Sequence, residues 1–164
     1  MLTYVIINCN LYENINFPNN IIIMENSNSI FYVVTESGGV YKVCVTEASA
    51  SIEKIFLRNL LENRLGLGYK LGPEMKFVGI TKRWGLWKFS SDDDKKPEYF
   101  NGGQWEGSHI HTSLIAGLFF REFAAIDFCK KNYGNYDTKE WYLQEQSREV
   151  LEEVKDHPLV LVEE

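Results

Sequence analysis

The chain has 164 residues, 45% of them hydrophobic and 14% aromatic, and its formal net charge is −6. This length suits one sizeable core rather than two, so we expect a single globular domain over residues 1–164. The overall acidity argues against nucleic acid and anionic lipid as partners.

The cysteines and the N-terminal segment indicate the cell compartment. Cys9, Cys44 and Cys129 are odd in number and lack the spacing of a zinc site or of a disulfide framework. Residues 1–14 have no basic region of the kind that begins a signal peptide. The most apolar stretch is interrupted by Arg121 and Glu122, so it falls short of a membrane span. We therefore expect a cytoplasmic protein that does not enter a membrane.

The charge is concentrated at one end of the chain. Residues 1–82 are balanced, with seven basic and seven acidic side chains. Residues 137–164 hold nine acidic side chains against three basic ones. This end of the chain can attract basic partners, although a solvated helix face without a partner shows the same pattern.

The first half of the chain favours β structure. Apolar runs at residues 3–8 and 20–24 predict strands, and residues 30–35 and 40–46 predict a hairpin that turns at Gly38 and Gly39. Apolar residues at spacings of three and four predict a helix that begins near Ser49 or Ser51 and ends near Leu65, before Gly66. Two further strands follow at 75–81 and 84–89, joined by only two residues.

The second half favours helices. A long polar and aromatic loop spans residues 90–108, and a strongly apolar segment predicts a central helix near 113–132 that Gly134 ends. Asp137 and Glu140 form a variant of a capping box before a last helix that ends near Asp156, and residues 159–162 predict a final strand. The fold class is therefore α+β, with a mainly antiparallel sheet of about five or six strands against about three helices.

The chemical motifs do not define a reaction. The sequence has no nucleophile elbow and no phosphate-binding glycine loop, and we expect no cofactor. His109 and His111 could serve acid–base or metal chemistry with a carboxylate such as Glu106 or Asp127, but no third metal ligand stands at a diagnostic spacing. We expect no metal site, and a packing role for the two histidines is the simpler interpretation.

A basic and aromatic cluster stands in the sequence KRWGLWK. Its members are Lys82, Arg83, Trp84, Trp87 and Lys88. Such a cluster can stack nucleic-acid bases, but the overall acidity of the chain argues against a nucleic-acid ligand. We therefore favour a pair of strands whose aromatic side chains pack against each other across the pair.

The leading functional hypothesis is a non-enzymatic inhibitor that neutralises a basic protein, such as a cytoplasmic immunity protein that blocks a nuclease toxin. The acidic C-terminal region would attract the partner, and aromatic residues of the long loop would anchor it. The expected binding residues are Asp92, Asp93, Asp94, Tyr99, Phe100, Trp105, Glu145, Glu149, Glu152 and Glu153. A small hydrolase or ligand-binding enzyme centred on His109 and His111 is the alternative, and a structural subunit of a larger assembly is a third possibility. The sequence leaves the partner's identity, the strand order and the oligomeric state open.

Overall fold

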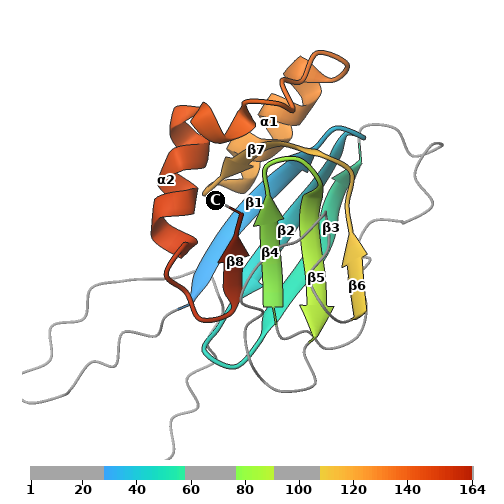
Figure 1. Cartoon of the computed structure of the whole chain (residues 1–164). Helices are drawn as coiled ribbons and strands as arrows, with labels where there is room; N and C mark the ends of the chain where they lie inside the picture. The colour runs from blue at the N-terminus through green and yellow to red at the C-terminus, as the bar shows by residue number, and fades with distance from the viewer. Residues whose placement is uncertain (1–27, 58–76, 91–107, 164) are drawn as a thin grey trace, which may run out of the picture.

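The computed structural model describes residues 28–57, 77–90 and 108–163 (Figure 1). In these residues the chain forms eight strands, two α-helices and one 3₁₀ turn. In chain order they are β1 Ser29–Thr35, β2 Gly39–Val45, β3 Ala50–Leu57, β4 Phe77–Thr81, β5 Gly85–Ser90, β6 Ser108–His111, β7 Ile115–Phe119, α1 Glu122–Asn132, η1 Trp141–Leu143, α2 Glu145–Val154 and β8 Val160–Val162. The prediction of a mainly antiparallel α+β fold is confirmed. The strands belong to two sheets, however, rather than to one.

The described strands form two four-stranded sheets that pack face to face (Figure 1). Sheet A has the strand order β3-β2-β1-β7, and sheet B has the order β6-β5-β4-β8. All pairings are antiparallel except β4 with β8, which is parallel. The expected final strand is confirmed as β8. The strands predicted at residues 3–8 and 20–24 lie outside the described residues.

The predicted first hairpin is confirmed as β1 and β2. Its strands pair from Ser29 opposite Val45 to Val34 opposite Val40. Gly38 takes a φ of 80°, and its N–H donates to the Thr35 carbonyl at 2.9 Å. This left-handed conformation costs glycine little, which is why the hairpin can turn here.

The helix predicted from Ser49 or Ser51 to Leu65 is wrong over residues 50–57, which form β3. Strand β3 pairs with β2, with Ile52 opposite Val43 and Phe56 opposite Val40. Ile52 packs in the core between the sheets, whereas Ile55 and Phe56 pack on the other face of sheet A. Apolar side chains on both faces of a strand, with an irregularity in register, produced the spacing that resembles a helix. The rest of that helix and its stop at Gly66 lie outside the described residues.

The central helix predicted near 113–132 is also wrong, because its first part is strand β7. All five residues of β7 are buried. Ile115 and Leu118 face the core between the sheets, and Ala116 and Phe119 face α1. A strand that is covered on both faces has a continuous run of apolar residues in its sequence. A buried helix has the same kind of run, so periodicity alone does not distinguish the two.

Helix α1 occupies the second part of the predicted segment and covers the face of sheet A that points away from sheet B. Its buried residues, Ala125 and Cys129, pack against Tyr32 and Val34. Phe123 is 81% exposed, so this helix is peripheral rather than central. Gly134 follows the helix with a φ of 85°, which confirms the predicted stop.

Strands β4 and β5 confirm the second predicted hairpin, but its turn is longer than expected. Lys82, Arg83 and Trp84 form the turn, and Gly85 closes it with a φ of 106°. The Thr81 hydroxyl accepts from the Trp84 N–H at 3.1 Å and donates to the Gly85 carbonyl at 2.6 Å. Thr81 and Gly85 therefore supply the turn chemistry that Lys-Arg lacks.

The main core lies between the two sheets and is closed at one side by η1 and α2. Trp141, Val150 and Val154 join the apolar side chains of both sheets. No helix in the described ranges is long and apolar enough to cross a membrane.

The last helix begins later than predicted. Asp137 caps the preceding turn, since its carboxylate accepts from the N–H groups of Lys139 and Glu140 at 3.0 and 3.1 Å. The next element is the short 3₁₀ turn η1, and α2 starts only at Glu145. Helix α2 ends at Val154, before the break expected at His157-Pro158.

Candidate functional site

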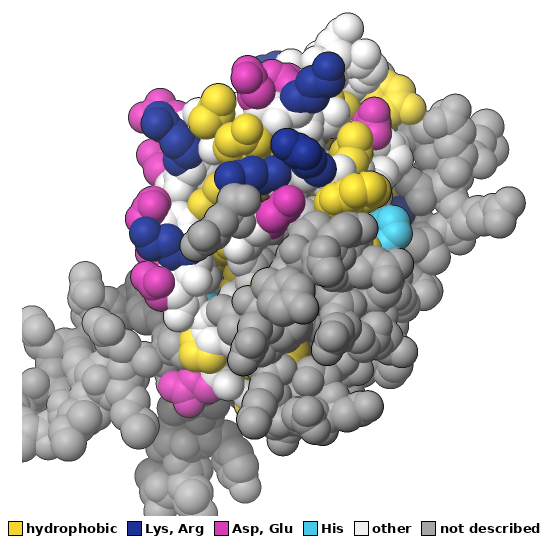
Figure 2. Space-filling model, viewed as in Figure 1, with side chains coloured by type: hydrophobic (Ala, Val, Ile, Leu, Met, Phe, Trp, Pro, Cys, Tyr) yellow, Lys and Arg dark blue, Asp and Glu magenta, His cyan; other side chains and the backbone are white. Residues whose placement is uncertain are grey.

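Helix α2 carries the expected acidic residues on its exposed side. Ser147, Val150 and Val154 are buried, and their spacing of three and four residues turns one face toward the core. The remaining surface of the helix presents four glutamates to solvent, namely Glu145, Glu149, Glu152 and Glu153. Figure 2 shows acidic side chains, with basic ones between them, along the edge of the molecule formed by α2.

Polar contacts fix α2 to the edge of sheet A. The Leu118 N–H of strand β7 donates to the Ser147 hydroxyl at 3.0 Å, and the Gln144 side-chain amide donates to the Ala116 carbonyl at 3.2 Å. These two side chains satisfy outward-pointing backbone groups of a strand that ends the sheet. The acidic face is therefore held on a rigid support rather than on a loop.

The exposed glutamates differ in their neighbours. Glu152 forms an ion pair with Lys155 at 2.7 Å, and its hydrogen bond raises the pKa of the Lys155 ammonium. Across the described ranges, no basic side chain forms an ion pair with Glu145, Glu149 or Glu153. Their charges face solvent and can attract a cationic surface.

The other half of the expected binding surface is not placed. Asp92, Asp93, Asp94, Tyr99, Phe100 and Trp105 belong to the long loop and lie outside the described residues. The structure brings the four helix glutamates together on the exposed side of α2.

The two candidate catalytic histidines lie on the edge strand β6, with one residue between them. The imidazole of His111 is exposed, stacks on Trp87 with ring centroids 4.6 Å apart, and places Nδ1 3.0 Å from the Thr112 carbonyl oxygen. The third histidine, His157, is buried, and its Nδ1 accepts from the Leu159 N–H at 3.0 Å. These contacts fit packing roles for His111 and His157.

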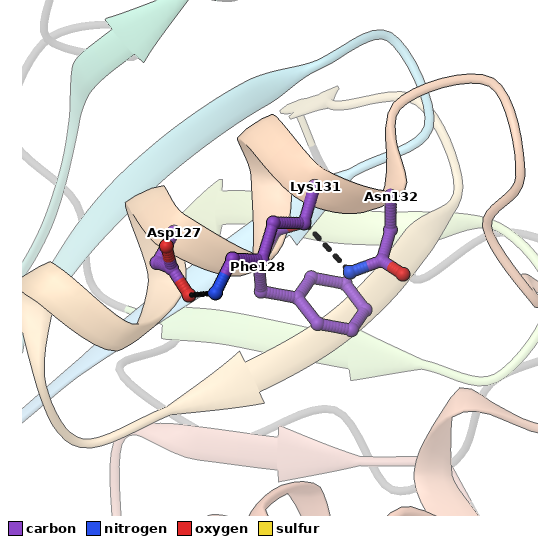
Figure 3. A network of polar contacts seen from close by, with 4 residues as sticks. All are labelled: Asp127, Phe128, Lys131 and Asn132. Atoms are coloured by element: carbon purple, nitrogen blue, oxygen red, sulfur yellow. Dashed lines mark hydrogen bonds and ion pairs between the residues drawn. The ribbon is translucent and has the colours of Figure 1, made fainter.

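The carboxylates considered as partners of the histidines do not gather around them in the described ranges. Asp127 lies on α1, on the far side of sheet A from β6, and forms an ion pair with Lys131 at 2.8 Å (Figure 3). In the same turn the Asn132 amide donates to the Phe128 carbonyl at 3.0 Å, which satisfies a carbonyl near the end of α1 (Figure 3). Glu106 lies outside the described residues. Among the residues that the structure places, no three His, Cys, Asp or Glu side chains form a group able to hold a metal ion.

Two lysines are buried in the sandwich, which the sequence patterns did not predict. Lys54 of β3 is 1% exposed, and its ammonium lies 5.1 Å from the centre of the Tyr41 ring. Lys88 of β5 is 7% exposed and lies opposite Val78, on the inner face of sheet B. Burial lowers the pKa of both ammonium groups, that of Lys88 to about 8, and raises the pKa of the Tyr41 hydroxyl to about 12.

The basic and aromatic cluster of residues 82–88 divides in the fold. Trp87 and Lys88 are buried, whereas Arg83 and Trp84 are exposed at the turn. Lys82, which begins this turn, lies beside η1, because Trp141 Nε1 donates to the Lys82 carbonyl at 3.2 Å. Sequence reasoning missed this neighbour because η1 follows 59 residues later.

Comparisons with models of protein families, with curated proteins and with solved structures find no match for this chain. The candidate site therefore rests on its own geometry. It is an acidic helix face, fixed to the edge of a two-sheet α+β fold.

Proposed function

We propose that this chain is a non-enzymatic protein-binding domain that recognises a basic partner through the exposed face of α2. The observation that carries the proposal is the set of three glutamates, Glu145, Glu149 and Glu153, that face solvent without an ion pair in the described part of the chain. Such a face speeds association with a cationic surface and selects against acidic partners.

The attachment of α2 to β7 favours binding over a purely structural role. The contacts of Gln144 and Ser147 with the edge of sheet A order the helix before any partner arrives. Less conformational entropy is then lost on binding. In this proposal the aromatic residues Tyr99, Phe100 and Trp105 of the loop provide apolar anchors, and Asp92, Asp93 and Asp94 extend the acidic surface.

The particular form that we propose is an inhibitor, such as an immunity protein that blocks a nuclease toxin in the cytoplasm. Nuclease clefts are cationic because they bind the phosphate backbone. An acidic helix face that enters such a cleft would compete with nucleic acid for the same side chains.

The experiment tests the products of the genes that neighbour this one, because an immunity protein is normally encoded beside its toxin. Each product is titrated with the whole chain by isothermal calorimetry, at salt concentrations from about 50 to 500 mM. We expect one basic product to bind and its affinity to fall steeply with salt, because exposed charges are screened at the upper end. A partner whose affinity ignores salt contradicts the electrostatic mechanism.

A matched pair of variants separates the α2 face from net charge. One variant replaces Glu145, Glu149 and Glu153 by Gln, and the control replaces three acidic residues of sheet A and its turns by Gln, namely Glu36, Glu47 and Glu53. Both variants remove three negative charges, but only the first alters α2. We expect the first to weaken binding about tenfold or more and the control to change it much less. Equal losses would mean that net charge alone attracts the partner, and the proposed site would be wrong.

A further inference from the structure

A second exposed cluster has the opposite charge to the α2 face. We call it the turn patch, and it consists of Lys82, Arg83 and Trp84 from the β4–β5 turn with Tyr142 from η1. Trp84 is 47% exposed, and Tyr142 is half-buried with its ring beside the Lys82 ammonium. Figure 2 shows basic side chains over the β4–β5 turn, near the middle of the displayed face, with hydrophobic side chains around them.

Contacts on both sides hold the turn patch in one conformation. On one side, the Lys82 carbonyl accepts from Trp141 Nε1 at 3.2 Å, and the Lys82 ammonium lies 4.9 Å from the centre of the Tyr142 ring. On the other side, the Lys82 N–H donates to a carboxylate oxygen of Glu163 at 2.7 Å. Both backbone groups of Lys82 are thus engaged, and Thr81 orders the turn from within. The exposed side chains project from a preorganised base.

The positive charge of the patch is available to a ligand. In the parts of the chain that the structure describes, neither Lys82 nor Arg83 forms an ion pair with a carboxylate. Glu163 accepts from the Lys82 backbone N–H, so its carboxylate adds one negative charge beside the two basic side chains, and the patch keeps a net positive charge. The Arg83 guanidinium is exposed, and it can bind a carboxylate with two parallel hydrogen bonds.

We propose that the turn patch binds a short acidic segment of a partner protein, in which a carboxylate stands beside an aromatic or aliphatic side chain. The carboxylate pairs with Arg83, and the apolar side chain covers the exposed indole of Trp84. Tryptophan and arginine are the residues that most often dominate binding energy at protein interfaces. The proposal is independent of the α2 face, which takes a partner of the opposite charge.

Charge distribution favours an acidic peptide over a nucleic acid. A nucleic-acid strand needs a series of cations along its phosphates, whereas the patch offers two. The acidic side chains of α2 lie on the same face of the molecule and would repel an extended polyanion (Figure 2). A single carboxylate with an apolar neighbour fits the size and charge of the patch.

The test measures binding of labelled peptides to the whole chain by fluorescence anisotropy. One peptide carries a single glutamate beside a phenylalanine in an otherwise uncharged sequence, a second replaces the glutamate by lysine, and a third replaces the phenylalanine by glycine. An oligothymidine strand is the fourth probe. We expect the first peptide to bind, and the other three to bind at least about tenfold more weakly. A tighter complex with the oligothymidine, or no binding by the first peptide, overturns the proposal.

Variants locate the binding site. Arg83→Glu and Trp84→Ala alter exposed side chains of the turn, and each is expected to reduce affinity for the first peptide about tenfold or more. Arg121→Glu is the matched control, because Arg121 is an exposed arginine at the start of α1, beyond the far end of β7. We expect this control to leave the affinity unchanged. If it weakens binding as much as Arg83→Glu does, the peptide responds to overall charge, and the assignment to the turn patch is wrong.

Discussion

Replacement of the buried Lys88 by methionine should change how the stability of the protein depends on pH. Burial lowers the pKa of this ammonium from 10.5 to about 8 in the folded protein. Between these two values the unfolded chain binds more protons at this position than the folded chain does. The free energy of unfolding therefore rises as the pH increases through this range, because the cost of burying the charge disappears. Below pH 8 the whole cost is present, and at 1.36 kcal/mol per pKa unit it amounts to about 3 kcal/mol.

The measurement is urea unfolding of the wild type and of Lys88→Met between about pH 7 and 9.5, and the ionisation of Tyr41 cancels in the comparison because both proteins carry this residue. Methionine has a similar length and carries no charge to desolvate, so we expect the variant to be the more stable protein at pH 7. The difference in free energy of unfolding between the variant and the wild type should shrink by about 2 kcal/mol from pH 7 to 9.5, as the Lys88 pKa values of 10.5 unfolded and about 8 folded require. An advantage that does not depend on pH would refute the reasoning. A variant that is less stable at pH 7 and gains on the wild type as the pH rises would show instead that the charged amine stabilises the fold.

Two further substitutions test the contacts that shape the fold. In Gly85→Ala the new Cβ would lie 2.5 Å from the Ser113 carbonyl oxygen, so urea unfolding should show a free energy of unfolding lower by about 2 to 4 kcal/mol. Gly134→Ala shares the positive φ but meets no atom within 4 Å, so it should lower the free energy of unfolding by only about 1 kcal/mol. Equal losses would exclude the steric cause. Ser147→Ala leaves the Leu118 N–H without its acceptor and should cost about 1 to 2 kcal/mol. Its signature is faster hydrogen exchange of that amide, and unchanged exchange would mean that α2 does not protect the edge of β7.

Local turn chemistry was the part of the fold that the sequence predicted best. Gly38 and Gly134 each occupy the turn or helix end at which a glycine indicated a change of direction. Asp137 caps a turn, but the helix that it was expected to begin starts only at Glu145. These features depend on neighbours within a few positions, so the sequence contains all the information that they need. The exposed acids of α2 were predictable for a similar reason, because the buried Val150 and Val154 define the opposite face of the same helix.

The errors arose in strands that carry apolar side chains on both faces. In β3 and β7, apolar side chains serve the core between the sheets on one side and the contact with α1 on the other. Such strands lack the alternation that marks a half-buried sheet, and their pattern overlaps with that of a helix. Whether a strand is covered on one face or on both depends on how the two sheets and α1 stack, and the sequence of the strand alone does not determine this. The turn patch was missed for a different reason, because its two parts lie 59 positions apart in the sequence and meet through the contacts of Trp141 and Tyr142 with Lys82.

The same contacts relate the two proposed surfaces to each other. Helix α2 follows η1 almost directly, and η1 is joined to the β4–β5 turn through Trp141. The acidic face and the basic patch are therefore held at a fixed separation by buried contacts rather than by a flexible linker. A partner that engages both must present a basic surface and an acidic segment in the matching arrangement, and a uniformly basic protein would be repelled at the turn patch. Two surfaces of opposite charge on one rigid support can thus select a single partner among many cationic proteins, which the acidic helix alone would not distinguish.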